Sequence, residues 1–238
     1  NYKKRIMAVS VDRVYQTVLA IANKEQRGYI TPQEFNLFAN QAQNEIFEQY
    51  FYDLNQFRRI PGNETVSSDP RDIIEEKIAL FRITNSSTSN PLSNDVYRLE
   101  AVRYRPHETD IWHEAEEVTK KEYDTYHVSK LTQPPINRPI FYRSGNTIYR
   151  SPVSGYTSTE IDYIKRPNSP NWTYIVVNGD ALFNPDISAG WRDFELHSSE
   201  EKNLVVKILQ FAGASMNDPD LVQTAGGKEA AYLQQEKS

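Results

Sequence analysis

Apolar residues follow a helical spacing in the first part of the chain. After Ser10 they recur three and four positions apart and form one stripe, made of Val11, Val14, Tyr15, Val18, Leu19 and Ala22. Ser10 or Asp12 can cap such a helix. Arg27-Gly28 marks its expected end, because glycine readily takes the left-handed conformation that terminates helices. The pattern therefore predicts a first helix over this range.

The next segment carries a stronger helical signal. Thr31 is followed by Pro32 and, three positions on, by Glu34, which is the arrangement of a capping box with proline at the first helical position. One face is apolar from Pro32 to about Arg58, formed by Phe35, Phe38, Ala39, Ala42, Ile46, Tyr50, Leu54 and Phe57. Because only a short turn separates the two helices, we expect them to pack antiparallel. Three aromatic residues lie off this face and are expected to cover a third helix or a neighbouring subunit: Phe47, Phe51 and Tyr52.

The stretch that follows is less regular. Pro70–Phe81 favours a short helix over 71–77 that can switch to a strand at Ile78. Thr84–Asp95 is rich in small polar residues, which predicts a loop.

Alternating apolar residues and turn residues predict strands in the middle of the chain. The predicted strands are Val96–Tyr104, Ile111–Trp112, Ile140–Arg143, Thr147–Arg150, Ser158–Arg166, Trp172–Val177 and Asp180–Phe183. Turn residues at 144–146 and at Asn178-Gly179 make two hairpins. A short helix is predicted over Glu116–Tyr126, with Thr119 as its cap.

The C-terminal part returns to a helical pattern. A helix is predicted over Leu196–Ala214, with Ser198 or Ser199 as its cap, and Asp218-Pro219-Asp220 should end it. A final helix over 221–237 is weakened by Gly226-Gly227, at about 1 kcal/mol for each glycine.

These elements predict an α+β fold. We expect an antiparallel α-helical bundle with an inserted small antiparallel β-domain and an extended C-terminal helical arm. The expected divisions are a helical part at 1–83, a β-rich module at 96–190 with a short helix near 117–127, and a C-terminal helix and docking arm at 191–238.

Charge is distributed unevenly along the chain. The formal net charge is -5. Between Pro134 and Pro167 five basic residues outnumber two acidic ones, a net charge of +3, whereas from Asn178 to Ser238 ten acidic residues outnumber five basic ones, a net charge of -5. A basic sheet and an acidic tail suggest complementary contacts between neighbouring subunits, with a solvated surface as the alternative.

Recognisable chemistry is missing from the sequence. Without cysteine there are no disulfides or thiolate metal sites. His113-Glu114 with Glu117 lacks the second histidine of the H-E-x-x-H zinc motif, and neither phosphate-binding glycine motif nor the G-x-S-x-G nucleophile motif occurs. We therefore expect no enzyme activity, no cofactor and no metal. The N-terminal segment has no long apolar run, so we expect no signal peptide and no membrane partner.

Four stretches carry a resemblance to a known family. They are ITPQEFNLFANQAQNEIFEQYF at 30–51, DVYRLEAVRY at 95–104, QPPINRPIFYRSGNTIYRSP with IDYIKRPNSPNW between 133 and 172, and DFELHSSEEKNLVVKILQFAGASMNDPDLVQ at 193–223. Their order resembles the head-to-tail adaptor proteins of short-tailed bacteriophages, of the tail tubular protein A type. It is closer still to the neck ring proteins of crAss-like phages.

The resemblance implies a structural subunit of the virion neck or tail, assembled in the host cytoplasm. It implies a homo-oligomeric ring of about twelve copies that joins the portal protein to the next tail or neck ring protein. DNA would pass through the ring without specific binding. The expected portal-docking residues are Leu221, Val222, Tyr232 and Leu233, and the expected neighbour contacts are Tyr142, Arg143, Tyr149, Arg150, Tyr163 and Arg166.

Three alternatives stay open. The chain could be a tail- or fibre-docking component of the same particle. Tyrosines interleaved with bases on a sheet could bind single-stranded nucleic acid. A glycan hydrolase is the third, because Glu160 and Asp162 alternate along a strand and can share a face.

Overall fold

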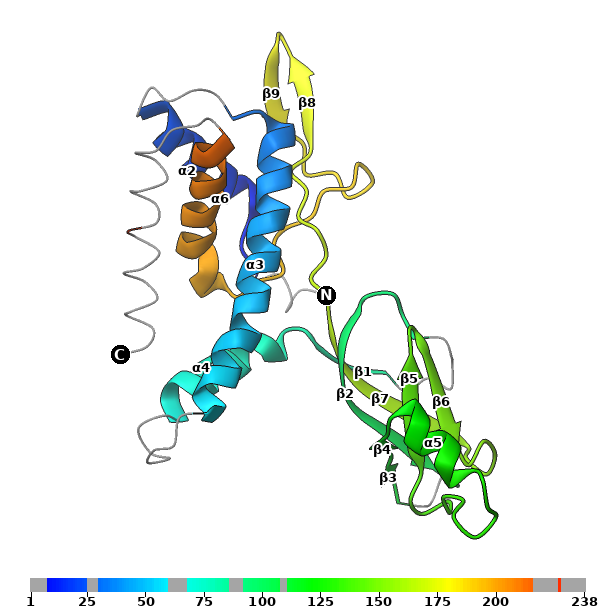
Figure 1. The fold of residues 1–238 in the computed structure, drawn as a ribbon. Coiled ribbons are helices and arrows are strands. Elements are labelled where there is room, and N and C mark those ends of the chain that lie inside the picture. Colours follow the sequence, from blue (N-terminus) through cyan, green and yellow to red (C-terminus); the bar gives the residue numbers. More distant parts are fainter. Residues whose placement is uncertain are drawn as a thin grey trace. The chain divides into compact units, whose positions relative to one another are not determined.

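Helices and strands form two units in the computed structural model, which describes residues 8–24, 30–59, 68–85, 92–107, 111–215 and 227 (Figure 1). Unit 1 comprises Asn1–Leu80 and Pro167–Ser238, and unit 2 comprises Phe81–Arg166. The protein is thus a mixed α and β protein with small sheets. The segment 167–190, which we expected within the β-rich module, belongs to unit 1.

The described helices of unit 1 are α2 (Val11–Lys24), α3 (Pro32–Arg59), α4 (Ser68–Ala79) and α6 (Glu201–Ser215), the last preceded by the short 3-10 helix η1 (Ser198–Glu200). Among them, α2 and α3 follow the predicted boundaries closely, whereas α4 is longer than predicted at both ends and α6 begins five residues after the predicted Leu196. The Thr31 capping box is present: the Glu34 amide donates to Thr31 Oγ1 (3.3 Å), and the Thr31 amide donates to Glu34 Oε2 (2.9 Å). The Thr31 hydroxyl, which donates to Glu34 Oε2 at 2.7 Å, and the Thr31 amide together hold the pKa of Glu34 below its usual value. The predicted cap at Ser198 or Ser199 is wrong, because His197 caps η1.

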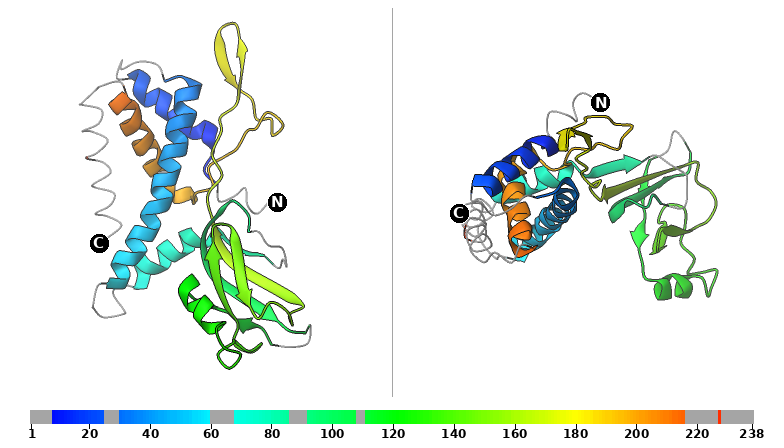
Figure 2. Two further views of the ribbon diagram at one scale, coloured as in Figure 1. Left: turned by 45° about the vertical axis from the view of Figure 1, so that its right-hand side comes forward. Right: turned by 90° about the horizontal axis from the view of Figure 1, so that it is seen from above.

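Helix α6 organises the packing of unit 1. It packs against both α2 and α3, and α4 packs against α3 (Figures 1 and 2). The predicted stripes of α2 and α3 are buried at nearly every described position, which confirms the helical periodicity. Phe47 and Phe51 are also buried and make an edge-to-face contact at 5.1 Å, whereas Tyr52 is exposed.

Polar side chains of α3 form hydrogen bonds with two irregular segments of unit 1 and hold them against the helix. Asn36 accepts from the Trp172 amide at 2.8 Å. Gln43, fully buried, donates to the Asn168 carbonyl (2.8 Å) and accepts from the Glu195 amide (3.0 Å). A buried amide side chain bonded on both sides fixes its neighbours without leaving an unsatisfied group. These bonds place Trp172, 1% exposed, in the core.

Unit 2 is built on two sheets. The first has the antiparallel order β1-β7-β2-β3, formed by Arg82–Asn85, Ser158–Lys165, Val96–Arg105 and His113–Glu114. The second has the order β4-β5-β6, formed by Glu116–Glu117, Ile140–Ser144 and Thr147–Ser151, with β4 parallel to β5. Both sheets contribute to one core cluster, made of Leu92, Val96, Val102, Tyr104, Ala115, Phe141, Ile148, Ile161 and Tyr163.

Local signals misplaced some elements in this region. The short strand expected to start at Ile111-Trp112 starts two residues later, at His113. The predicted helix starting at Glu116 is wrong in its first turn: Glu116–Glu117 forms β4, and α5 (Lys120–Tyr126) begins after its cap Thr119. A capping box between Thr119 and Glu122 fixes that start. Helix α4 continues through Ile78 to Ala79, so the predicted switch to a strand there is also wrong.

A hairpin of unit 1 forms as its turn residues predict. Strands β8 (Tyr174–Val177) and β9 (Asp180–Phe183) pair with Ile175 opposite Leu182. Both turn residues have positive φ, 53° at Asn178 and 95° at Gly179, which is the requirement of the two-residue turn that matches strand twist. The base of the hairpin is anchored by Trp172, whose ring stacks near Tyr174 (5.7 Å) and Phe183 (5.9 Å).

Candidate interaction surfaces

Tyrosines gather on the outer face of β5 and β6. Tyr142 and Tyr149 are cross-strand partners whose rings stack at 4.8 Å with an interplanar angle of 8°. Tyr123 of α5 meets Tyr142 edge-on at 4.7 Å and donates to the Arg150 carbonyl at 2.9 Å. His127 completes this attachment through a ring contact with Tyr123 (4.4 Å) and a hydrogen bond with Ser151 Oγ (2.9 Å). The cluster therefore attaches α5 to the sheet and leaves Tyr149 exposed.

The sheet separates the arginines from these tyrosines. Because side chains alternate along a strand, Arg143 and Arg150 share the face of the buried Phe141 and Ile148. The Arg150 guanidinium lies over the rings of Tyr104 (5.2 Å) and Tyr156 (5.6 Å), and it donates to Thr159 Oγ1 (3.2 Å). The Arg150 side chain thus makes most of its contacts within unit 2. The mixed tyrosine and arginine face that the sequence suggested does not form.

The remaining predicted site residues are dispersed. Tyr163 is buried in the core cluster of unit 2, and burial raises the pKa of its hydroxyl. Arg166 is exposed at the end of β7, with its guanidinium 5.9 Å from the Tyr97 ring. The predicted portal-docking residues lie outside the described residues: Leu221, Val222, Tyr232 and Leu233.

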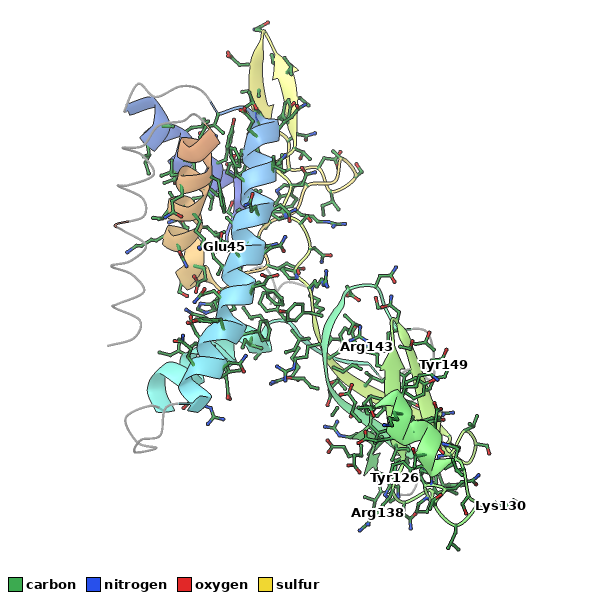
Figure 3. The ribbon with its side chains drawn as sticks, viewed as in Figure 1. Glu45, Tyr126, Lys130, Arg138, Arg143 and Tyr149 are labelled. Atoms are coloured by element: carbon green, nitrogen blue, oxygen red, sulfur yellow. The ribbon has the colours of Figure 1, made fainter. Side chains whose placement is uncertain are left out.

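An ordered loop with exposed apolar and basic side chains follows α5. We name it the basic loop, residues 128–138; it contains Lys130 and Arg138 and no acidic residue. Val128 is 85% exposed and Leu131 is 95% exposed, yet the backbone is held by hydrogen bonds from Thr132 Oγ1 to the carbonyls of Tyr126 and Ser129, both at 3.0 Å. Figure 3 shows Tyr126, Lys130 and Arg138 toward one end of unit 2, with Arg143 and Tyr149 toward the other.

The hairpin of unit 1 presents a second exposed apolar surface. We name the segment 174–190 the acidic hairpin, because it contains Asp180 and Asp186 and no basic residue. Its cross-strand pair Ile175 and Leu182 is exposed on one face, and Val176 is 66% exposed on the other. A two-stranded hairpin by itself is marginally stable in water, and here the stacking of Trp172 near Tyr174 and Phe183 anchors its base. Exposed apolar surfaces of this kind are typical of protein interaction sites.

The side chains considered above as candidate catalytic groups lie on strands, and two of them form ion pairs. His113 and Glu114 lie on a strand rather than on a helix, and the described residues contain no cluster of three or more potential metal ligands. The Arg103 guanidinium pairs with both Glu160 (2.9 Å) and Asp162 (2.7 Å). These ion pairs link neighbouring strands of the sheet.

No model of a known protein family matches the chain, and no curated protein matches it significantly. Within the described residues, no helix is both long enough and apolar enough to cross a membrane.

Sequence reasoning missed both exposed surfaces. The signals were present: Val128, Leu131 and Ile136 are aliphatic residues in a proline-interrupted stretch that fits neither a helix nor a strand face. In the hairpin, Ile175, Val176 and Val177 are consecutive apolar residues, so one of them must point away from the other two. Only the structure shows that unit 1 covers neither face of that hairpin tip.

Tyr104 makes the stability of unit 2 sensitive to alkaline pH. Burial raises the pKa of Tyr104 from 10.0 to about 12, an effect that the nearby Arg150 partly opposes. The unfolded chain ionises first as the pH rises, so this contribution is fully present below pH 10 and is lost between pH 10 and about 12. The loss should be roughly 2 to 3 kcal/mol at the upper end. Urea unfolding of wild type and Tyr104→Phe across this range should show a steeper decline in the wild type; equal slopes would contradict the assignment.

Proposed function

We propose that the chain is a structural subunit of a bacteriophage neck. In this proposal, about twelve copies form a ring that joins the capsid portal to the next neck or tail ring, and DNA leaves the capsid through its bore. Unit 1 is the antiparallel helical bundle, unit 2 is the β-domain inserted into it, and the C-terminal segment is an extended helical arm that docks on the portal. The protein acts as a scaffold and carries out no reaction.

The observation that carries this proposal is apolar exposure on ordered backbone. Leu131 in the basic loop and Val176 in the acidic hairpin are exposed on segments that hydrogen bonds or ring stacking hold in place. Preformed surfaces of this kind lose little entropy when a partner covers them. They suit a subunit whose functional state is an assembly.

The outer face of α3 suits the passage of DNA. Gln41, Asn44, Glu45 and Glu48 are exposed along this 28-residue helix (Figure 3 labels Glu45). Phosphate groups are held chiefly by lysine and arginine. The same face carries the exposed side chains of Leu37 and Tyr52, and Glu45 pairs with Lys207 Nζ at 3.2 Å, so the face offers few positive charges to hold DNA phosphates.

Assembly with the portal protein tests the proposal. Mass photometry and negative-stain microscopy of the full chain with its portal should show rings, and a chain that stays a monomer and never joins the portal would refute the function. A tail- or fibre-docking component would instead bind fibre protein in preference to the portal. A glycan hydrolase would release sugar from host cell-surface glycan, with the release lost in Glu160→Ala and Asp162→Ala.

Deleting residues 221–238 should abolish portal binding while the remainder stays folded. The reason is that every strand of the described sheets ends by residue 183, and the described helices of unit 1 pack on one another. Circular dichroism should lose only the helical signal of the deleted arm and keep a cooperative unfolding transition, and pull-down by the portal should be lost. Unchanged affinity for the portal would show that the arm does not dock there.

A further inference from the structure

Exposed aliphatic side chains concentrate in two short segments of opposite charge. Of the twelve large aliphatic side chains that lie exposed among the described residues, eight fall in the basic loop or the acidic hairpin: Val128, Leu131, Ile136, Ile175, Val176, Val177, Leu182 and Ile187. The basic loop has a net charge of +2 and the acidic hairpin a net charge of -2, with no opposite charge in either. Each surface therefore exposes apolar side chains that a partner could bury, and its charged residues all have the same sign.

Most of the charged side chains on the two surfaces take part in no described ion pair, although Asp186 accepts hydrogen bonds from Ser188. Among the described residues, Lys130, Arg138 and Asp180 take part in no ion pair, unlike charged side chains such as Arg103, which pairs with Asp162. All three side chains are exposed. Charges that lack internal partners and flank exposed apolar groups are the arrangement found around the edge of a protein interface.

Contacts within each unit also hold the backbone of both surfaces. Ile136 packs over Gly155, and its carbonyl accepts from the Tyr156 hydroxyl at 3.2 Å. The acidic hairpin is held at its base by Trp172 and at its turn by Asn178-Gly179. An apolar hairpin face and an apolar loop that are both held by internal contacts can pack closely, because neither side must refold.

We infer that the basic loop of one copy docks on the acidic hairpin of the next copy. The inference rests on the proposed ring and specifies the contact that closes it. The loop belongs to unit 2 and the hairpin to unit 1, so the contact joins two different patches and is heterologous. Head-to-tail contacts of this type generate rings when the rotation between copies closes. The partner is a second copy because the same chain carries both complementary surfaces.

A charge-exchange experiment tests the contact in trans. Variant A, Lys130→Glu with Arg138→Glu, makes the loop acidic. Variant B, Asp180→Lys with Ala189→Lys, makes the hairpin basic; Ala189 is exposed, and Asp186 is left intact because it accepts from Ser188 in the following turn. In an assembly of A alone or of B alone, the loop of one copy and the hairpin of the next copy then carry charges of the same sign. In a mixture, the acidic loop of A faces the basic hairpin of B, and the basic loop of B faces the acidic hairpin of A.

The expected results follow from these pairings. Mass photometry should show that A alone and B alone need about tenfold or more higher concentration than wild type to form rings, and that an equimolar mixture recovers most of the wild-type assembly. The control, Arg98→Glu with Lys202→Glu, reverses one exposed base on each unit outside both surfaces and should assemble like wild type. Circular dichroism should report the same fold for all variants.

Each failure has a distinct meaning. Rings formed by A or B alone at wild-type concentration would overturn the contact and leave the neck function standing. A mixture that stays as unassembled as A and B alone would overturn it too, since the defect would then not be the pairing of these charges. Wild type that forms no rings, alone or with the portal, would overturn both the contact and the proposed function.

Discussion

Replacing Lys77 by methionine should destabilise unit 1 by about 3 to 5 kcal/mol. Lys77 Nζ lies 2.7 Å from Glu200 Oε1, and both side chains are buried. Methionine keeps most of the apolar stem but removes the charge. The Glu200 carboxylate would then stay buried with a hydrogen bond from Asn203 (3.2 Å) and without its cation, which is the expensive half of a broken ion pair.

A second change should reverse most of this loss. In Lys77→Met with Glu200→Met, neither charge is buried, and replacement of a buried pair by apolar side chains is often close to neutral. Urea unfolding followed by circular dichroism should therefore place the double variant within about 1 kcal/mol of wild type. A double variant as unstable as Lys77→Met would show that the ion pair itself, not the unpaired carboxylate, supplies the stability.

An exposed ion pair provides the matched control. Lys120 and Asp124 lie 3.4 Å apart with both side chains largely in solvent. Lys120→Met should cost less than about 0.5 kcal/mol. Because the two units can unfold separately, hydrogen exchange should locate the effect of Lys77→Met in α4 and α6 and leave β2 and β7 unchanged. Equal losses in Lys77→Met and Lys120→Met would contradict the special role of burial.

Replacing Trp172 by alanine should cost unit 1 about 3 to 5 kcal/mol. The indole is almost completely buried, with its ring 4.2 Å from that of Tyr15, and its Nε1 donates to Asp12 Oδ1 at 2.9 Å. Its ring also stacks near the rings of Tyr174 and Phe183 at the base of the acidic hairpin. Its removal leaves a cavity in unit 1 and releases the base of the hairpin.

Two variants separate these contributions. Trp172→Phe keeps much of the packing and loses the hydrogen bond to Asp12, so it should cost about 1 to 2 kcal/mol. Trp112→Ala removes a partly exposed ring from beneath the Arg105 guanidinium (4.7 Å) and should cost roughly 1 kcal/mol in unit 2 alone. Hydrogen exchange should show loss of protection in β8 and β9 for Trp172→Ala only. A hairpin that stays protected would mean that Trp172 does not anchor it.

The Trp172 variant also connects stability with assembly. If the acidic hairpin contacts the next copy, loosening its base should weaken ring formation even at temperatures where unit 1 remains folded. The expected order of ring assembly is wild type, then Trp172→Phe, then Trp172→Ala. Assembly by Trp172→Ala equal to wild type would argue against the hairpin as a preformed docking surface.

Features set by near neighbours were predictable from sequence. The capping boxes at Thr31 and Thr119 depend on residues three positions apart. The Asn178-Gly179 turn depends on two residues that tolerate positive φ. Helical stripes and hairpin strands depend on periodicity alone. Each signal acts over a few residues, so the folded context did not need to be known.

Features that join distant segments were decided only by the tertiary structure. Sequence could not show that α6 packs against both α2 and α3, that Gln43 is buried to hold Asn168 and Glu195, or that Lys77 and Glu200 form a buried pair. Charge was the most misleading signal: Arg150 counts as positive in the sequence but lies over tyrosine rings within unit 2. Composition counts every charge alike, whereas burial and pairing determine which charges remain free to meet a partner. For that reason the candidate interaction surfaces are the basic loop and the acidic hairpin, and not the strands that carry the tyrosines and arginines.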